Sequence, residues 1–397
     1  MEYPILKLKP GKEVSLKYRH PWVFSGALQD TDEKISHGSI VRVSNPEGEI
    51  LGTGTFSNKS MITVRIFDFS DAEINREWLL NKIRKAAEFR KFLGYGNPDT
   101  TGYRIVFGES DGLPGLIVDK YEDVLVLQIS TKGMELLKPV LIDVLTEIFS
   151  PSAIVENSDL GVRNEEGMPQ ASGVLFGKFD EPVTFRENGY KFFCDPLNGQ
   201  KTGFFLDQKD LRSAVGKWSE NRKVLNLFSY TGATSVYALK NGAASVLNID
   251  GSDWALEGCA KNAKLNRIPA AKIKTEKADI FAWLGRPIHE PEYDMVISDP
   301  PAIIKTRNDI ESGKKAYHFL NRAAMRLVKD NGIFVTSSCS HYLTSADLRM
   351  ILHRAAVQNN LTLRVISEYS QSPDHPVALN FPESCYLKSF IGLIERE

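Results

Sequence analysis

The sequence has little cysteine, no long apolar run and almost no net charge, and each shortage excludes a class of protein. Its four cysteines among 397 residues form no CxxC or Cys/His pattern, so neither a disulfide framework nor a metal site is expected. No window approaches about 20 consecutive apolar residues, and the first residues, MEYPILKLKPGKEV, lack the apolar core of a signal peptide. We therefore predict a cytoplasmic protein that binds no metal and does not cross a membrane, in which any functional cysteine acts alone.

The net charge of -1 excludes a uniformly basic surface, so a nucleic-acid partner would have to be bound by local basic patches. The length suffices for two or three domains. Residues 1–70 alternate short β-type runs with turn residues, which predicts a small β-barrel-like module. A connector helix and a central α+β domain are predicted over 71–190, and a third domain over 191–397.

From about residue 195 the pattern alternates strands and helices, which predicts an α/β fold with a parallel sheet between helices. The last two strands are expected to form a hairpin-like edge. The seven predicted strands are KVLNLF, ASVLNID, AAKIKTEKAD, YDMVISDPP, GIFVTSSCS, LTLRVISEY and KSFIGLIE. Because ligands bind beyond the carboxyl ends of such strands, polar residues at those ends are the candidate site.

Three of these strand ends favour an adenosine cofactor. Gly232 lies in the first strand-to-helix turn, where a ligand could approach the backbone. Asp250 ends the second strand, 20 residues after Tyr230, at a spacing typical of a carboxylate that binds ribose hydroxyls. Asp279 follows the third strand and could meet an adenine edge. The structural alternative is that each Asp caps the helix that follows it.

The fourth and fifth strand ends carry the candidate chemistry. Asp299 precedes two prolines that stiffen the turn, which is suited to holding a flat base or amide. Cys339 follows the next strand in a polar context, Ser-Ser-Cys-Ser-His, which favours a nucleophile over a small buried side chain. A thiolate that adds to carbon six of a pyrimidine makes carbon five nucleophilic towards a methyl donor.

Two further roles complete this cycle. Asp299 is the candidate that polarises the N3 edge of the pyrimidine. A base must also remove the proton from carbon five before the thiol leaves, and Glu383 and His375 lie in the late part of the chain where such a base is expected.

The motifs QKTGFFLDQ, VLNLFSYTG, NIDGS, DPPA, SSCSH, DHPV and ESCYLK together resemble the RlmI type of ribosomal RNA large-subunit cytosine-C5 methyltransferases. The likeness spans almost the whole chain, and PWVFSGAL with GTGTFSNKSMITVRIF looks like that family's RNA-binding PUA domain. The resemblance implies a seven-stranded Rossmann-like domain, S-adenosylmethionine as cofactor, formation of 5-methylcytidine in large-subunit ribosomal RNA, and a homodimer.

Carried over motif by motif, the resemblance implies that Asp299 contacts the target base and Cys339 attacks it, while Glu383 as base is our hypothesis by analogy with uridine methyltransferases. Ile303 departs from the pattern, because an aromatic residue is expected in that loop. Read without the family, KTGFFLDQ would be a turn followed by a helix cap at Asp207. The residues implied to bind the cofactor are Lys201, Thr202, Phe205, Gln208, Phe228, Tyr230, Thr231, Gly232, Asp250, Ser252, Asp279 and Asp299.

Two local groups of basic residues are candidates for binding RNA. The first combines Lys17 and Arg19 with Trp22 near the N-terminus. The second is the loop after DPPA, with Lys305 and Arg307 followed by Lys314 and Lys315. These groups could hold phosphates around an extruded base, although a solvated charged face is the alternative for either.

Three other functions stay open at this stage. An NAD-dependent dehydrogenase would share the first strands but gives no reason for Asp-Pro-Pro or for a cysteine at a strand end. A nitrogen methyltransferase acting on a purine in RNA would share the cofactor but would need no thiol. A non-catalytic RNA-binding protein would leave the acidic residues at successive strand ends unexplained.

Overall fold

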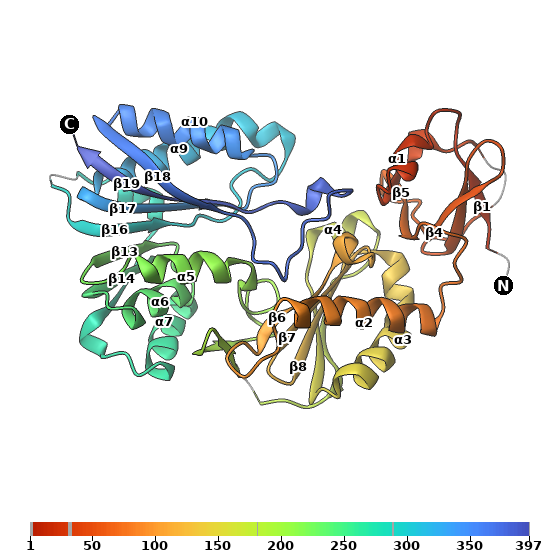
Figure 1. Ribbon diagram of the computed structural model, residues 1–397, viewed down its shortest axis with the longest axis horizontal. Helices are drawn as coiled ribbons and strands as arrows, with labels where there is room; N and C mark the ends of the chain where they lie inside the picture. Colours follow the sequence, from red (N-terminus) through yellow and green to blue (C-terminus); the bar gives the residue numbers. More distant parts are fainter. Residues whose placement is uncertain (1–2, 31–33, 181, 288–289, 397) are drawn as a thin grey trace. The chain divides into compact units, whose positions relative to one another are not determined.

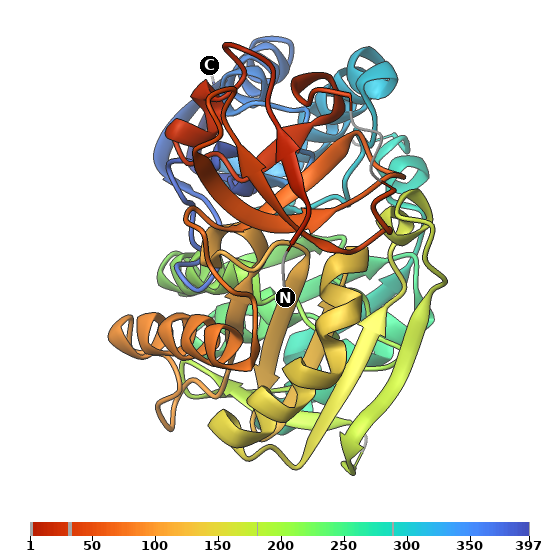
Figure 2. The same ribbon diagram turned by 90° about the vertical axis from the view of Figure 1, so that its right-hand side faces the viewer.

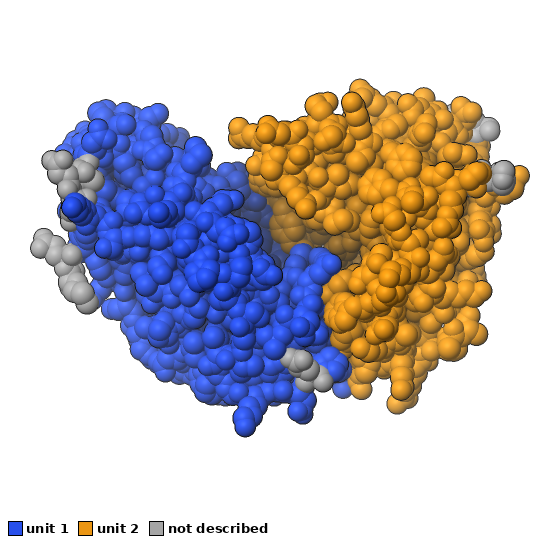
Figure 3. All heavy atoms as spheres, turned by 180° about the vertical axis from the view of Figure 1, so that it is seen from behind, with its two compact units in different colours: residues 1–188, 194–206, 373–384 blue, residues 189–193, 207–372, 385–397 orange. Residues whose placement is uncertain are grey.

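The computed structural model describes residues 3–30, 34–180, 182–287 and 290–396. The chain forms two compact units, coloured separately in Figure 3. The first unit comprises residues 1–188, 194–206 and 373–384, and the second comprises 189–193, 207–372 and 385–397. No helix among the described residues is long and apolar enough to span a bilayer.

The first unit begins with a five-stranded sheet that curves around its own apolar core, drawn in red in Figure 2. The strand order is β1-β3-β4-β5-β2. Leu8, Val41 and Val64 in this core are fully buried. The elements are β1 (Ile5–Lys7), α1 (Val14–Lys17), β2 (Trp22–Phe24), η1 (Ser25–Ala27), β3 (Ile40–Ser44), β4 (Ile50–Phe56) and β5 (Ile62–Asp68). The predicted barrel-like module is therefore confirmed.

A second five-stranded sheet, of order β10-β9-β8-β7-β6, follows in the same unit. Helices α2 and α3 pack on it through one shared apolar core. The elements are α2 (Arg76–Phe92), β6 (Gly102–Phe107), η2 (Gly108–Asp111), β7 (Leu116–Tyr121), β8 (Val124–Ile129), α3 (Lys132–Phe149), β9 (Ala153–Ser158), α4 (Gly161–Glu165) and β10 (Ala171–Gly177). The hairpin of β11 (Val183–Glu187) and β12 (Tyr190–Cys194) comes next.

The two sheets of the first unit are joined by close packing and a buried ion pair. A Cβ added at Gly133, in the first turn of α3, would lie 2.3 Å from Cβ of Thr55 on β4, so only glycine allows this approach. Arg65 on β5 donates to Glu166, just after α4, over 2.7 Å. Both side chains are at least nine-tenths buried, so the pair fixes one sheet against the other.

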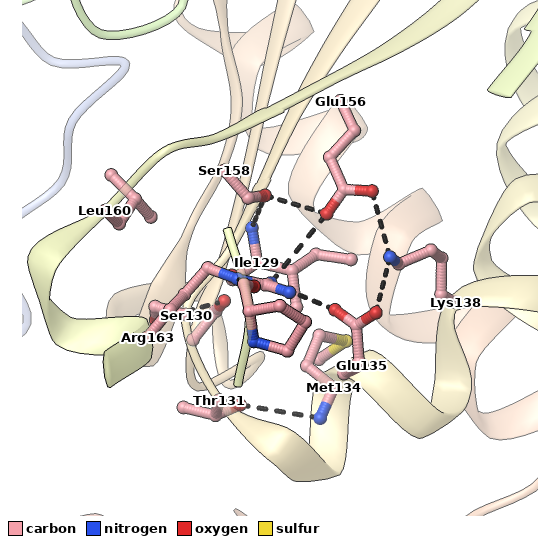
Figure 4. A network of polar contacts seen from close by, with 12 residues as sticks. Ile129, Ser130, Thr131, Met134, Glu135, Lys138, Glu156, Ser158, Leu160 and Arg163 are labelled. Atoms are coloured by element: carbon pink, nitrogen blue, oxygen red, sulfur yellow. Dashed lines mark hydrogen bonds and ion pairs between the residues drawn. The ribbon is translucent and has the colours of Figure 1, made fainter. Parts of the chain in front are cut away.

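Buried charges also hold the ends of β8 and β9 to α3 and α4 (Figure 4). The guanidinium of Arg163, which is 1% exposed, donates to the backbone oxygen of Ile129 and to Glu135. Lys138 binds both Glu135 and the buried Glu156. Each buried charge therefore has an opposite charge or a hydrogen bond, as burial in a protein interior demands.

The second unit is built on a seven-stranded sheet of order β15-β14-β13-β16-β17-β19-β18. Strands β13 to β17 are parallel, and β19 runs antiparallel to both β17 and β18. The strands are β13 (Lys223–Leu227), β14 (Ser245–Asp250), β15 (Ile273–Lys277), β16 (Tyr293–Ser298), β17 (Val328–Ser338), β18 (Leu361–Tyr369) and β19 (Lys388–Arg396). All seven predicted strands and the antiparallel final pair are confirmed.

Helices cover both faces of this sheet (Figure 1). Alternate strand residues explain why: Val224 packs with α5 and α6, whereas the next residue, Leu225, packs in the core that α8, α9 and α10 share. The helices are α5 (Lys209–Lys217), α6 (Ala233–Lys240), α7 (Asp253–Leu265), α8 (Ile280–Leu284), α9 (Ile310–Arg326) and α10 (Ser345–Val357). Short 3-10 turns are η3 (Leu206–Gln208), η4 (Ala270–Lys272), η5 (Arg307–Asp309) and η6 (Pro382–Ser384).

Candidate functional site

The turn after β13 has an unusual backbone. Phe228, Tyr230 and Gly232 all have left-handed φ angles, of 57°, 47° and 71°. A Cβ at Gly232 would lie 2.8 Å from Sγ of Cys259, so α7 packs directly under the turn and excludes any larger residue. Left-handed non-glycine residues cost free energy, and they gather at sites where backbone groups must face a ligand.

Asp250 is held at the end of β14 as an acceptor. Its Oδ2 accepts from the backbone N–H of Tyr230 at 2.9 Å, and its Oδ1 accepts from that of Ser252 at 3.0 Å. The helix cap of α7 is Ser252, whose hydroxyl accepts from Ala255, so capping does not explain Asp250. A carboxylate has about four acceptor positions, and these two contacts leave room for ribose hydroxyls.

Asp279 has the capping role that the structural alternative predicts. Strand β15 ends at Lys277, and Oδ1 of Asp279 accepts from the N–H of Ala282 at 2.8 Å at the start of α8. Its side chain is exposed. One carboxylate oxygen is therefore used by the helix, and contact with an adenine edge stays a prediction.

Two buried hydroxyls lie beside these residues without a hydrogen-bond partner in the described part of the chain. They are Oγ1 of Thr231, next to Gly232, and Oγ of Ser298, the last residue of β16. Both residues are 1% exposed. Native proteins rarely leave buried hydroxyls unsatisfied, so this edge of the sheet fits a polar cofactor such as an adenosine derivative.

The Asp-Pro-Pro turn brings two predicted residues together. Asp299 follows β16, and its Oδ2 accepts from Nε2 of Gln208 at 2.7 Å. Gln208 is the N-cap residue of α5. The sequence-based alternative of a cap at Asp207 is wrong, because Asp207 lies one position earlier in η3, where its carboxylate accepts from the hydroxyl of Tyr386.

Cys339 is partly exposed and directly follows β17, as predicted. The serines on either side of it are fixed by one phenol: the hydroxyl of Tyr317 on α9 lies 2.8 Å from Oγ of Ser338 and 2.9 Å from Oγ of Ser340. Ser340 also accepts from the N–H of Ile304 at 3.1 Å. The thiol-bearing loop and the loop after Asp-Pro-Pro are therefore tied together.

A cation lies at the same loop. Lys388 is opposite Ser338 in the antiparallel pairing of β17 with β19, and its Nζ donates to the backbone oxygen of Ser340 at 2.8 Å. Burial lowers the pKa of Lys388, and negative charge at Cys385 and Cys339 opposes that shift. An ammonium group near a thiol favours the thiolate.

The other thiols differ from Cys339 in their surroundings. Burial raises the pKa of Cys259 to about 12, and its Sγ donates to the backbone oxygen of Tyr230. Burial also raises the pKa of Cys194 well above its usual value. Cys385 is exposed. Cys259 is therefore a packing residue, as the sequence indicated.

Several predicted residues belong to the first unit. Thr202 is fully buried, and its hydroxyl donates to Asp119 at 2.6 Å and contacts the hydroxyl of Tyr121. Nζ of Lys201 lies 4.4 Å from the ring centroid of Phe205. The roles of Lys201, Thr202 and Phe205 in binding the cofactor stay predictions.

Glu383 and His375 also lie in the first unit. Oε1 of Glu383 is 3.4 Å from Nε2 of His20. His375 is 2% exposed and lies 3.0 Å from the carboxylate of Asp374, so it is a buried partner of that group. Neither contact tests whether Glu383 is the general base.

The candidate RNA-binding residues have mixed surroundings. Lys17 and Arg19 are exposed, whereas the indole N–H of Trp22 donates to Glu109 at 2.9 Å. Lys305 and Arg307 are exposed beside the loop after Asp-Pro-Pro. Lys314 and Lys315 lie on α9, so their placement in that loop was wrong; the helix begins at Ile310 because its apolar face packs on the sheet.

Sequence reasoning missed Tyr317 and Lys388. Tyr317 occupies a buried position of an amphipathic helix, a pattern that by itself indicates core packing. Lys388 opens a predicted strand, but its register against β17 cannot be read from the chain. The sequence offered one signal: Lys388 lies three residues after Cys385, at the start of a predicted strand, so a lysine near a thiol could have been noticed there.

Comparison with known proteins identifies two domains in the chain. Residues 6–69 match the PUA-like domain, and residues 152–367 match the S-adenosylmethionine-dependent methyltransferase family. The chain is similar to a structure of a SAM-dependent methyltransferase from Streptococcus mutans, with a TM-score of 0.83, 21% identity and coverage of 98% of this chain and 100% of that one. A methyltransferase structure complexed with S-adenosylhomocysteine has a TM-score of 0.84, at 21% identity over 99% of this chain and 100% of the other.

Curated relatives match over nearly the full length. Ribosomal RNA large subunit methyltransferase I of Aliivibrio fischeri is 37% identical over 386 residues, covering 96% of this chain and 97% of the relative. The protein of that name from Serratia proteamaculans is 37% identical over 390 residues, covering 97% and 98%. The chain therefore belongs to the S-adenosylmethionine-dependent methyltransferases and, among them, to the family of ribosomal RNA large subunit methyltransferase I.

Proposed function

We propose that this enzyme methylates carbon five of a cytosine in large-subunit ribosomal RNA and that Cys339 is its nucleophile. One observation carries the proposal: a partly exposed thiol follows β17, held by Tyr317 through both neighbouring serines and accompanied by the ammonium of Lys388. The names of the full-length relatives supply the substrate class.

The first step is addition of the Cys339 thiolate to carbon six of the cytosine. A sulfur–carbon bond forms, and the electron pair of the ring double bond moves to carbon five. Asp299, positioned by Gln208, is proposed to act in its protonated form and donate a hydrogen bond to N3 of the base, which stabilises the negative charge that develops on the ring. The ammonium of Lys388 is proposed to favour the thiolate form that attacks.

The acidic and hydroxyl groups at the ends of β13, β14 and β16 are proposed to bind the cofactor. Asp250 would accept from ribose hydroxyls, and the left-handed turn around Gly232 would present backbone groups to the methionine part. When bound, S-adenosylmethionine supplies an electrophilic methyl group for carbon five.

The last step restores the ring. A base removes the proton of carbon five, the carbon–carbon double bond forms again, and the thiolate of Cys339 leaves with the electron pair of the sulfur–carbon bond. Glu383 remains the predicted base. The Glu383→Gln variant tests that role, because slow elimination would cause the covalent RNA adduct to accumulate during turnover.

A covalent trap tests the nucleophile. RNA that contains 5-fluorocytidine should form a denaturant-resistant complex with the enzyme, because fluorine cannot leave as a proton does. Cys339→Ala should lose the complex and all methylation, whereas the control Cys385→Ala should keep both. Methylation by Cys339→Ala would refute the mechanism and favour a nitrogen methyltransferase. The cytoplasmic location and the homodimer stay predictions.

A further inference from the structure

A groove runs between α9 and α10, which lie side by side in Figure 1. One hollow, of about 500 Å³, lies between the two helices; a second, of about 330 Å³, lies beyond the C-terminal end of α10 and is lined by α9, residues 290–291 and Arg396, and Gln358 lines both. The first hollow includes Lys314, Lys315 and Arg354 in its lining, and the second includes Arg322, Arg326 and Arg396. Lys314 and Lys315 are among the candidate RNA-binding residues, and the four arginines are additional to them.

The cations follow one stripe of α9. Lys314, Arg322 and Arg326 lie along one side of the helix over about 18 Å, with His318 between them at the same four-residue spacing. Arg354 faces them from α10. Arg322 and Arg326 are four residues apart, and like charges at this spacing repel each other and weaken a helix. A stripe of this kind therefore suits an extended anion better than it suits the helix itself.

The acidic groups of the groove neutralise only part of its positive charge. Asp347 pairs with Lys314 at 2.7 Å, while Glu311 and Glu290 are the other carboxylates in the lining. Within the described residues, no carboxylate lies within ion-pair distance of Arg322 or Arg354. Burial lowers the pKa of His318, and the positive charges of Arg322 and Arg354 lower it further.

We propose that the α9–α10 groove binds the phosphate backbone of the ribosomal RNA substrate, as a second contact surface apart from the nucleophile. The proposal rests on the proposed function for the identity of the RNA. A small anion would fill one hollow, whereas a stripe of about 18 Å with cations in both hollows matches successive phosphates of a strand. Backbone contacts of this kind position a substrate without reading its sequence.

Charge reversal tests the groove. The probe is a large-subunit ribosomal RNA transcript, and filter binding is measured across a range of salt concentrations. In Arg322→Glu/Arg354→Glu, we expect at least a tenfold weaker affinity at low salt and a salt slope smaller by about 1.4 to 1.8. The affinity for S-adenosylmethionine should not change. Arg364→Glu, an exposed arginine of the same unit, is the matched control and should retain the parent slope.

Parent-like affinity and slope in the double variant would overturn the proposal. Poly-glutamate serves as a second probe. The proposal would also be overturned if the parent enzyme bound poly-glutamate and the double variant lost only that binding, because this result would indicate an acidic protein partner. The readout is binding and needs no methyl transfer. Failure of the trapping experiment with Cys339 therefore refutes the chemistry, whereas failure of this experiment refutes only the groove.

Discussion

The two units of the molecule satisfy their buried polar groups in different ways. In the first unit, buried side chains such as Arg90, Arg104, Asp119, Glu156 and Arg163 carry full charges and form ion pairs. In the second unit, hydroxyl and amide groups dominate the buried polar residues, including Asn226, Asn248, Ser298, Tyr317, Thr336 and Ser340. The difference indicates that buried charge in the first unit stabilises its fold, whereas the charge of Lys388 beside Cys339 is proposed to serve the reaction.

The largest expected effect comes from breaking a buried ion pair in the first unit. Arg163→Met would leave the nearly buried Glu156 without the guanidinium beside it and would remove the bond to the oxygen of Ile129. We expect a loss of about 3 kcal/mol in the free energy of unfolding, because the backbone oxygens of Ile129 and Pro169 lose their buried donor while Glu156 keeps its ion pair with Lys138. Urea unfolding followed by hydrogen exchange should locate the loss in β8, β9 and α3. If the amides of β8, β9 and α3 exchanged as slowly as in the parent, the view that buried charges stabilise the first unit would be contradicted.

A neutral contact in the second unit should matter less for stability and more for activity. Tyr317→Phe removes the hydroxyl that joins Ser338 to Ser340 and costs about 1–2 kcal/mol. The flanks of Cys339 lose their anchor, so methylation should fall while cofactor affinity is kept. Asn321→Ala on the same helix is the control for stability. Equal methylation rates in Tyr317→Phe and the parent would show that the contacts of Tyr317 with Ser338 and Ser340 do not position the thiol.

Lys388 tests the difference between the two units directly, because its charge is proposed to serve the reaction and not to stabilise the fold. In a Cys385→Ala background, Lys388→Met should slow alkylation of Cys339 by iodoacetamide several-fold at neutral pH and move its pH profile to higher pH. Lys388→Arg should restore much of the rate. Peptide mass spectrometry reports the modified residue. A profile identical to that of the parent would remove Lys388 from the mechanism.

The smallest effect is expected for an exposed pair. Arg364 on β18 donates to Glu395 on β19, but both groups are accessible to water, and exposed ion pairs are weak. Arg364→Gln should leave the urea midpoint of the second unit unchanged, in contrast to Arg163→Met. A comparable loss in both variants would mean that burial does not decide the value of an ion pair here.

The sequence sufficed to predict the fold because its patterns are local. Seven apolar runs bounded by turn residues predicted seven strands, and Cys339 fell directly after β17 as expected. The contacts around that thiol could not be predicted from the sequence. Tyr317 and Lys388 reach the loop from α9 and β19, and their positions depend on helix packing and strand register, which are long-range properties.

The carboxylates show the same limit at a finer scale. Asp250 ends β14 and Asp279 follows β15, and the same capping alternative applied to each. Only three-dimensional geometry separates them, because Ser252 caps α7 and Asp279 itself caps α8. A local pattern can therefore predict that a polar group lies at the sheet edge, but not which hydrogen bond it makes.

The assignment of residues 373–384 to the first unit has a consequence for how the chain folds during synthesis. Arg90 donates to the backbone oxygen of Asp374, 284 positions later, and the carboxylate of Asp374 accepts from the N–H of Arg104, 270 positions away. The first unit cannot complete its interior until almost the entire second unit has left the ribosome. Contacts so distant in sequence are slow to form. The first unit therefore stays incompletely folded during synthesis until residues 373–384 have been made.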